Sequence, residues 1–248
     1  MSLVITLRGA SGSGKSTIVR KLLQRFGATP RYLGGMRQLT IGEVRVLGPH
    51  SALQPSRDLS VIANWARVPN LIGYDLRCPT PTFVVGGYVE TASCGSEWLV
   101  KKYDTAFVRQ IVRCEVLKGH NVLLEGLLLS KSAGPWLDLA EPPASGAKLN
   151  SARQQQVNVL KSTGWWKTTA WHSSVWVWAF LDTPYEVCRQ RVLDRGGKGV
   201  LRQFDQDWTR IEKVRQKMAQ DGRGVTVYLP HDRAHLTLGD WLQNGGCG

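Results

Sequence analysis

The chain has 248 residues, of which 42% are hydrophobic, and it carries a formal net charge of +13. This length supports one sizeable α/β core and is short for two complete domains, so we expect a single domain with insertions over residues 1–248. No run of about eighteen apolar residues could span a bilayer, and the chain begins without the regions of a signal peptide. We therefore expect a protein of the cytoplasm whose excess positive charge meets a polyanion, usually a nucleic acid.

Apolar, β-rich runs alternate with helical patterns, which indicates a mostly parallel sheet with crossover helices. Strands are expected at residues 3–7, 82–86, 121–125, 175–181 and 225–229, and helices at 15–26, 96–118, 185–195 and 236–242. The segment 40–46 alternates polar and apolar residues and predicts an antiparallel ribbon at one edge of the sheet. It falls in an insertion of about residues 31–81, whose proline-rich part, 49–81, is expected to be irregular, while 142–151 is expected to be a mobile connection.

The clearest motif, G-x-x-x-x-G-K-S, stands between the first expected strand and the first expected helix. Glycines permit the tight turn, successive backbone N–H groups converge on an anion, and the helix adds the positive end of its dipole. This pattern predicts a nucleoside triphosphate site in which Lys15 reaches the β and γ phosphates and Ser16 holds Mg²⁺. The residues expected to contact the nucleotide are Gly9, Ala10, Ser11, Gly12, Ser13, Gly14, Lys15, Ser16 and Thr17.

The strand at 82–86 opens into small residues, an aromatic residue and two carboxylates. Tyr88 is predicted to be a stacking platform for a base, and Glu90 or Glu97 to be the general base that accepts a hydroxyl proton. Asp75 is a weaker candidate for the same general base. The alternative for each of these residues is a surface position without a role in chemistry.

Glu125 stands at the carboxyl end of the apolar strand 121–125, where the ligands of open α/β sheets gather. It is predicted to be the acidic partner of Mg²⁺ and to complete the arrangement that Ser16 begins. The alternative is a solvated carboxylate at a strand end.

Arg191 and Arg195 are four residues apart, so they share one face of the helix 185–195. Two guanidinium groups there could close over a transferring phosphoryl group, as part of a basic lid of about residues 189–222 with a hinge at 196–199. Such a lid excludes water and so prevents hydrolysis of ATP. The alternative is a solvated basic helix face.

Tryptophans occur in two settings. Trp165 and Trp166 lie within residues 142–181, which contain four basic residues and no carboxylate. Aromatics interleaved with cations suit an unpaired or flipped base, although an interface with another protein would also explain them. Trp176 and Trp178 lie on the same face of a strand and are predicted to be core residues.

Four segments, residues 9–16, 83–90, 119–130 and 180–184, resemble those of bacteriophage P-loop kinases of thymidine hypermodification, the 5-hydroxymethyluracil DNA kinases. The resemblance implies a nucleotide-kinase-like P-loop NTPase fold that transfers phosphate from ATP, with Mg²⁺, to the 5-hydroxymethyl group of a base already within DNA. It also implies modified DNA as the partner, downstream DNA-modifying enzymes as further partners, and the host cytoplasm as the location. The chain departs from the family pattern at residues 93–97, which leaves the general base open between Glu90 and Glu97.

Two other functions remain open on the sequence alone. The first is a kinase of free nucleosides, nucleotides or sugars, whose basic surface is incidental. The second is a nucleic-acid-binding P-loop ATPase that hydrolyses ATP and transfers nothing. A polymer substrate would give an affinity that falls steeply with salt, which separates the first from a DNA kinase.

Overall fold

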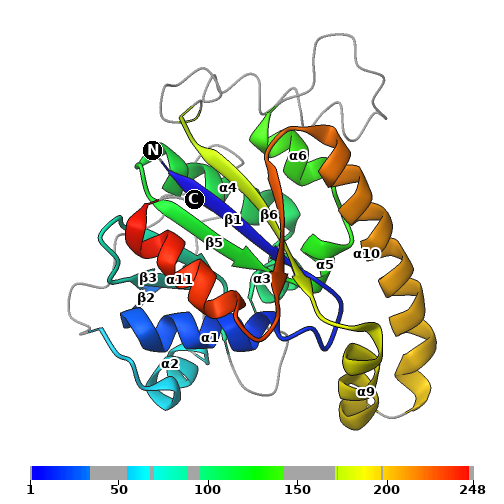
Figure 1. Cartoon of the computed structure of the whole chain (residues 1–248). Helices are drawn as coiled ribbons and strands as arrows, with labels where there is room; N and C mark the ends of the chain where they lie inside the picture. The colour runs from blue at the N-terminus through cyan, green and yellow to red at the C-terminus, as the bar shows by residue number, and fades with distance from the viewer. Residues whose placement is uncertain are drawn as a thin grey trace.

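The computed structural model describes residues 2–33, 55–67, 70–88, 95–141, 171, 173–196 and 198–245. Its centre is a seven-stranded sheet in the order β2-β3-β4-β5-β1-β6-β7 (Figure 1). The strands are β1 (Leu3–Arg8), β2 (Ala28–Tyr32), β3 (Leu71–Leu76), β4 (Thr82–Val85), β5 (Asn121–Glu125), β6 (Val175–Asp182) and β7 (Val225–Pro230). The five strands from β4 to β7 in this order are parallel, while β3 is antiparallel to both β2 and β4.

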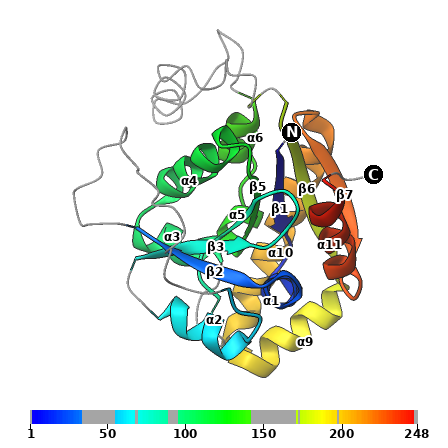
Figure 2. The ribbon, with the colours of Figure 1, turned by 90° about the vertical axis from the view of Figure 1, so that its left-hand side faces the viewer.

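Helices cover both faces of the sheet, as Figure 2 shows from the side. One face carries α1 (Lys15–Phe26), α2 (Leu59–Ala66) and α11 (Ala234–Asn244). The other carries α3 (Ser96–Lys102), α4 (Thr105–Leu117), α5 (Leu127–Ser130), α6 (Gly134–Ala140), α9 (Tyr185–Gly196) and α10 (Leu201–Asp221), with a 3₁₀ turn, η2 (Lys198–Val200), between the last two. Within the described ranges, no helix is long and apolar enough to cross a membrane.

Most elements of the parallel part were predicted within a few residues. Trp176 and Trp178 of β6 lie in the same core cluster, as their spacing predicted. The helix expected at 96–118 is two helices, because the Asp104 carboxylate accepts a hydrogen bond from the Phe107 N–H at 2.7 Å and so begins α4 anew.

The expectation of an irregular segment over 49–81 is wrong, because this segment contains α2 and β3. The antiparallel extension of the sheet pairs residues 28–32 with 71–76, whereas the ribbon expected at 40–46 lies outside the described residues, as does the connection at 142–151. Most of β3 is buried, so its residues show no polar and apolar alternation from which a strand could be recognised.

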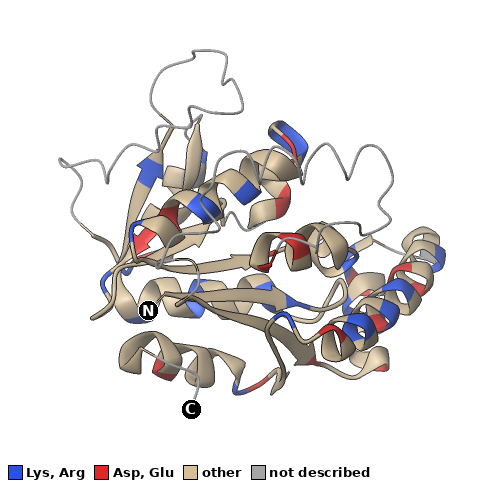
Figure 3. Ribbon diagram, turned by 90° about the horizontal axis from the view of Figure 1, so that it is seen from above, with Lys and Arg blue, Asp and Glu red and all other residues tan. Residues whose placement is uncertain are grey.

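The segment expected as a basic lid divides into two parts. Helix α10 connects β6 to β7 and buries Phe204, Ile211 and Met218 in the same cluster as Trp178. It carries five basic and four acidic residues, and Figure 3 shows the two signs interspersed along it, at the right of that view. This helix is therefore part of the core, and the lid hypothesis narrows to α9.

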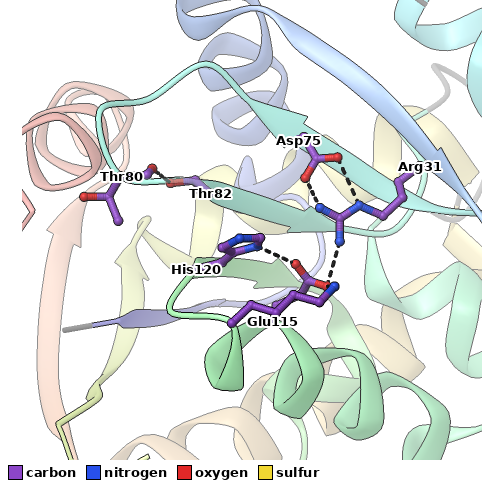
Figure 4. Close-up of polar contacts among 7 residues, drawn as sticks. Arg31, Asp75, Thr80, Thr82, Glu115 and His120 are labelled. Atoms are coloured by element: carbon purple, nitrogen blue, oxygen red, sulfur yellow. Dashed lines mark hydrogen bonds and ion pairs between the residues drawn. The ribbon is translucent and has the colours of Figure 1, made fainter. Parts of the chain in front are cut away.

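A buried ionic cluster joins the antiparallel strands to helix α4 (Figure 4). Arg31 of β2 is 2% exposed, donates from Nε to Asp75 of β3 at 3.0 Å, and pairs through Nη1 with Glu115 of α4 at 2.6 Å. Glu115 is fully buried and also contacts Lys118 and His120. In the sheet register, Asp75 pairs with Phe83, and Phe83 pairs with Val122, which lies three residues before Glu125. The Asp75 carboxylate therefore belongs to this cluster and not to the site at Glu125.

We predict that Arg31→Leu lowers the free energy of unfolding by about 3–5 kcal/mol, because it leaves the fully buried Glu115 carboxylate and the partly buried Asp75 carboxylate without the cation that they share. The matched control is Arg25→Leu, whose ion pair with Asp240 is exposed and should cost less than about 1 kcal/mol. Urea unfolding of the two variants checks this. Equal midpoints would show that the cluster adds nothing to stability.

Candidate active site

The glycine-rich loop (Gly9–Gly14) connects the end of β1 to the start of α1, as the motif predicted. Gly9, Gly12 and Gly14 have φ angles of 151°, 80° and 95°, in a region that favours glycine. A Cβ atom on Gly12 would lie 2.6 Å from the carbonyl oxygen of Cys188 in α9. The loop can therefore take this course only with glycine at that position.

Lys15 is the first residue of α1, and its side chain turns back into the loop. Its Nζ donates to the carbonyl oxygens of Gly9 and Ala10, both at 2.9 Å, and the residue is only 7% exposed. Burial lowers the pKa of the ammonium group, while the nearby Glu125 carboxylate opposes this shift. The Lys15 ammonium is thus held beside the loop amides, where it can exchange neutral carbonyl partners for stronger anionic ones.

Ser16 and Glu125 were predicted to form a metal site together, and the structure brings them into contact. The Ser16 Oγ donates to Glu125 Oε1 at 3.0 Å. A hydroxyl and a carboxylate are oxygen donors of the kind that Mg²⁺ prefers. In the part of the chain that the structure describes, no three His, Cys, Asp or Glu side chains cluster, so Mg²⁺ held here would take its remaining ligands from phosphates and water.

Glu125 is only 2% exposed, and burial raises its pKa to about 7. Lys15 and the hydrogen bond from Ser16 oppose this shift, and the neighbouring Glu97 carboxylate adds to it. Gly95 packs directly against the carboxylate, because a Cβ atom there would lie 2.4 Å from Oε1. A bound cation would favour the ionised form of Glu125, which burial disfavours.

Glu97 is the second residue of α3 and lies near Glu125. Its Oε1 is 3.1 Å from Lys101 Nζ, and its Oε2 accepts from the Leu127 N–H at 3.4 Å. A Cβ atom on Gly126, next to Glu125, would lie 3.6 Å from the Cβ of Glu97. The structure thus places one of the two predicted general bases at the candidate metal site, while Glu90 lies outside the described residues.

The prediction for Tyr88 is wrong. Its side chain is 2% exposed, its hydroxyl donates to the Val85 carbonyl at 3.4 Å, and its ring packs near that of Tyr74. A ring buried on this scale cannot stack on a base, so Tyr88 is a core residue. The predicted aromatics Trp165 and Trp166 lie outside the described residues.

Arg191 and Arg195 are exposed on α9, beside the glycine-rich loop. The Arg191 Nη1 donates to the Gly12 carbonyl at 3.0 Å, and the Arg195 Nε donates to the Arg191 carbonyl at 2.9 Å. The charge of Arg195 also contributes to lowering the pKa of Lys15, so both guanidinium groups act at the loop.

Sequence reasoning missed Ser130. Its Oγ accepts from the Gly9 N–H at 3.0 Å and donates to the Gly126 carbonyl at 2.7 Å. It thereby joins the first residue of the glycine-rich loop to the residue after Glu125. Gly9 is 121 residues away from Ser130 in the sequence, so no local spacing marks this contact.

Arg8, the last residue of β1, was also missed. It is fully buried and donates from Nη1 to the carbonyls of Leu129 at 2.7 Å and Ser132 at 3.0 Å, and it lies near the rings of Trp178 and Phe180. Burial lowers its pKa to about 9. A charged residue inside an otherwise apolar strand was the available signal.

Comparison with known proteins finds a similarity to a phage protein. Over 106 residues, the chain is 41% identical to a 5-hmdU DNA kinase of Pseudomonas phage M6. The chain resembles this phage protein. The match covers 42% of this chain and 41% of the relative, so it spans less than half of that protein's length. It confirms the resemblance to phage kinases of thymidine hypermodification, whereas no family model and no solved structure matches the chain.

We predict that Glu125→Gln makes the free energy of unfolding less sensitive to pH. The pKa of Glu125 rises from 4.5 to about 7 on folding, so the folded state binds this proton more tightly and wild-type stability falls as pH rises through that window. At pH 8 the variant should be more stable by up to about 3 kcal/mol, and at pH 4 the two should be alike. Urea unfolding at several pH values, without divalent cations, checks this; parallel curves would contradict it.

We predict that Ser130→Ala weakens the affinity for Mg²⁺-ATP about tenfold, because the loop and the Glu125 strand lose their common hydrogen-bond partner. The free energy of unfolding should fall by about 1–3 kcal/mol, since two buried backbone groups lose a partner. Ser132→Ala is the control for ATP affinity, because the Ser132 hydroxyl bonds to the Leu128 carbonyl and the Trp136 indole rather than to the glycine-rich loop. Calorimetric titration with ATP, in the presence and in the absence of Mg²⁺, checks whether Ser130 connects the loop to the Glu125 strand. If it does, the variant loses more affinity with Mg²⁺ than without it; an equal loss in both conditions would contradict the prediction.

Proposed function

We propose that this chain is an ATP- and Mg²⁺-dependent kinase that phosphorylates the 5-hydroxymethyl group of 5-hydroxymethyluracil in phage DNA. The observation that carries the proposal is the 41% identity to a protein named 5-hmdU DNA kinase. The contact between Ser16 and Glu125 and the position of Lys15 in the glycine-rich loop support it independently.

The fold proposed is that of a P-loop NTPase of the nucleotide-kinase type, formed by the chain as one domain. The parallel order β4-β5-β1-β6-β7, with the loop after β1 and the carboxylate at the end of β5, supports this assignment. The insertion of about residues 31–81 then supplies β3 and α2, and α9 supplies the lid.

In the proposed mechanism, Lys15 and the loop amides hold the β and γ phosphates, and Ser16 and Glu125 hold the metal ion. When bound, that ion would supply positive charge that neutralises the charge developing on the transferred phosphoryl group. Arg191, already bonded to the loop at Gly12, and Arg195, one turn further along α9, would close over the phosphates.

The acceptor hydroxyl must be oriented and must lose its proton. Its oxygen forms a bond to the γ phosphorus, the bond from that phosphorus to the β–γ bridging oxygen breaks, and ADP leaves. We assign the proton to Glu97, since its carboxylate lies beside Glu125, and we retain Glu90 as the other candidate. The ion pair with Lys101, at 3.1 Å, would help to orient this carboxylate.

The net charge of +13 supports a polymeric substrate. A protein that neutralises several phosphates releases their counterions, so its affinity falls steeply with salt. A kinase of free nucleosides would need cations only at the triphosphate.

The test is incubation with γ-labelled ATP and Mg²⁺ in the presence of DNA containing 5-hydroxymethyluracil, unmodified DNA or the free hydroxymethyl nucleoside. We expect label on the modified DNA alone, and none with Lys15→Ala, which lacks the ammonium group at the phosphates. Comparable labelling of the free nucleoside would indicate a small-molecule kinase. Release of inorganic phosphate without a labelled acceptor would indicate an ATPase.

A further inference from the structure

A cavity of about 140 Å³ lies directly beside the glycine-rich loop. Gly9, Ala10 and Ser13 line it from the loop, residues 180–185 line it from the end of β6, and α10 closes it with Trp208. It therefore opens at the carboxyl ends of two neighbouring parallel strands, β1 and β6, where α/β sheets bind their ligands. We call this cavity the ring pocket.

The size of the ring pocket fits one six-membered ring. An apolar cavity of roughly 150 Å³ in another protein holds a single benzene molecule. A pyrimidine has one such ring, so the volume is sufficient for it.

Three aromatic residues, Phe180, Tyr185 and Trp208, contribute to the walls of the ring pocket. The rings of Tyr185 and Trp208 meet edge to face, with centroids 5.1 Å apart and an interplanar angle of 86°. The buried Phe204 ring packs against both of them, and the Tyr185 hydroxyl donates to Asp205. Both rings are therefore held in place before a ligand arrives, and aromatic faces of this kind stack on bases.

The rim of the ring pocket offers both hydrogen-bond acceptors and donors. Arg215 lies 3.7 Å from a carboxylate oxygen of Asp182 and 3.6 Å from one of Glu212, and its guanidinium covers the ring of Tyr228 at 4.1 Å. These ion pairs are long and partly exposed, so the groups can exchange partners. A uracil edge presents one N–H donor between two carbonyl acceptors, which a carboxylate and a guanidinium complement.

We infer that the ring pocket receives the pyrimidine ring of the acceptor nucleotide, turned out of the DNA stack, with Trp208 as its stacking residue. The inference rests on the proposed function and adds to it the location of the acceptor base. Turning the base out is needed because its reactive group cannot reach an enclosed site from within a duplex. A ring bound here lies against the same loop that would hold the triphosphate.

The test compares Trp208→Leu with Trp241→Leu, a half-buried tryptophan that packs on the opposite face of the sheet. For Trp208→Leu we expect the KM for DNA containing 5-hydroxymethyluracil to rise at least tenfold, with the Kd for Mg²⁺-ATP changed less than twofold. Trp208→Phe should restore most of the loss, and Trp241→Leu should change neither constant. Thermal melts identify any variant that does not fold.

Glu212→Gln, at the rim of the pocket, is the second variant, because a partly exposed side chain can be changed without disturbing the core. We expect a severalfold rise in the same KM. A loss of Mg²⁺-ATP affinity in Trp208→Leu with an unchanged KM for DNA would show that the pocket takes adenine, and it would overturn the inference. An unchanged KM for DNA together with an unchanged Kd for Mg²⁺-ATP in both Trp208→Leu and Glu212→Gln would overturn the inference as well.

Labelling by the wild-type protein distinguishes failure of the proposed function from failure of the ring-pocket inference. If this protein transfers no label to modified DNA, the ring pocket is tested by titration with free 5-hydroxymethyl-2′-deoxyuridine, followed by tryptophan fluorescence. Quenching in the wild type that is absent from Trp208→Phe would retain the pocket as a pyrimidine site, while equal quenching in both would remove it.

Discussion

The pairing of β1 with β5 is the constraint on which the candidate site depends. Leu7 of β1 lies opposite Glu125 of β5, so the glycine-rich loop begins two residues beyond the level of the carboxylate. Parallel strands end at the same edge of the sheet, and the helix that follows the loop brings Ser16 to that carboxylate at 3.0 Å. The two parts of the site thus meet through sheet register, although 109 residues separate them in the chain.

The same register places two groups of opposite charge, Glu125 and Lys15, largely out of contact with water. Glu125 is buried beside a second carboxylate, and burial raises its pKa to about 7, while burial lowers the pKa of Lys15. Each group supplies part of the other's compensation, and each is left with only neutral hydrogen-bond partners besides. Buried charged groups whose pKa values are shifted in this way cluster at functional sites.

The part of the site that could be predicted from the sequence is the part that local spacing determines. The glycines at fixed intervals, Lys15 and Ser16 belong to one turn, and Glu125 follows from the end of an apolar run. Ser130 and Arg8 could not be found in this way, because their hydrogen bonds join residues more than 120 positions apart. Tyr88 was misassigned for a related reason: its sequence neighbours are small and polar, and only the fold places its ring in the core.

The fold was predicted to a similar extent. The parallel strands were recognised as apolar runs, and helix α1 by its position after the glycines, whereas β3 and α2 were hidden in a proline-rich segment. The ring pocket combines residues from the loop, from the end of β6 and from α10, so no single segment of sequence contains its pattern. The sequence of helix α10 is typical of a charged surface helix. In the structure its apolar side packs on the sheet, and its Trp208 lies beside the glycine-rich loop. The glycine-rich loop could therefore be recognised from a local pattern, whereas the ring pocket beside it is assembled by the fold from segments that are distant in the sequence.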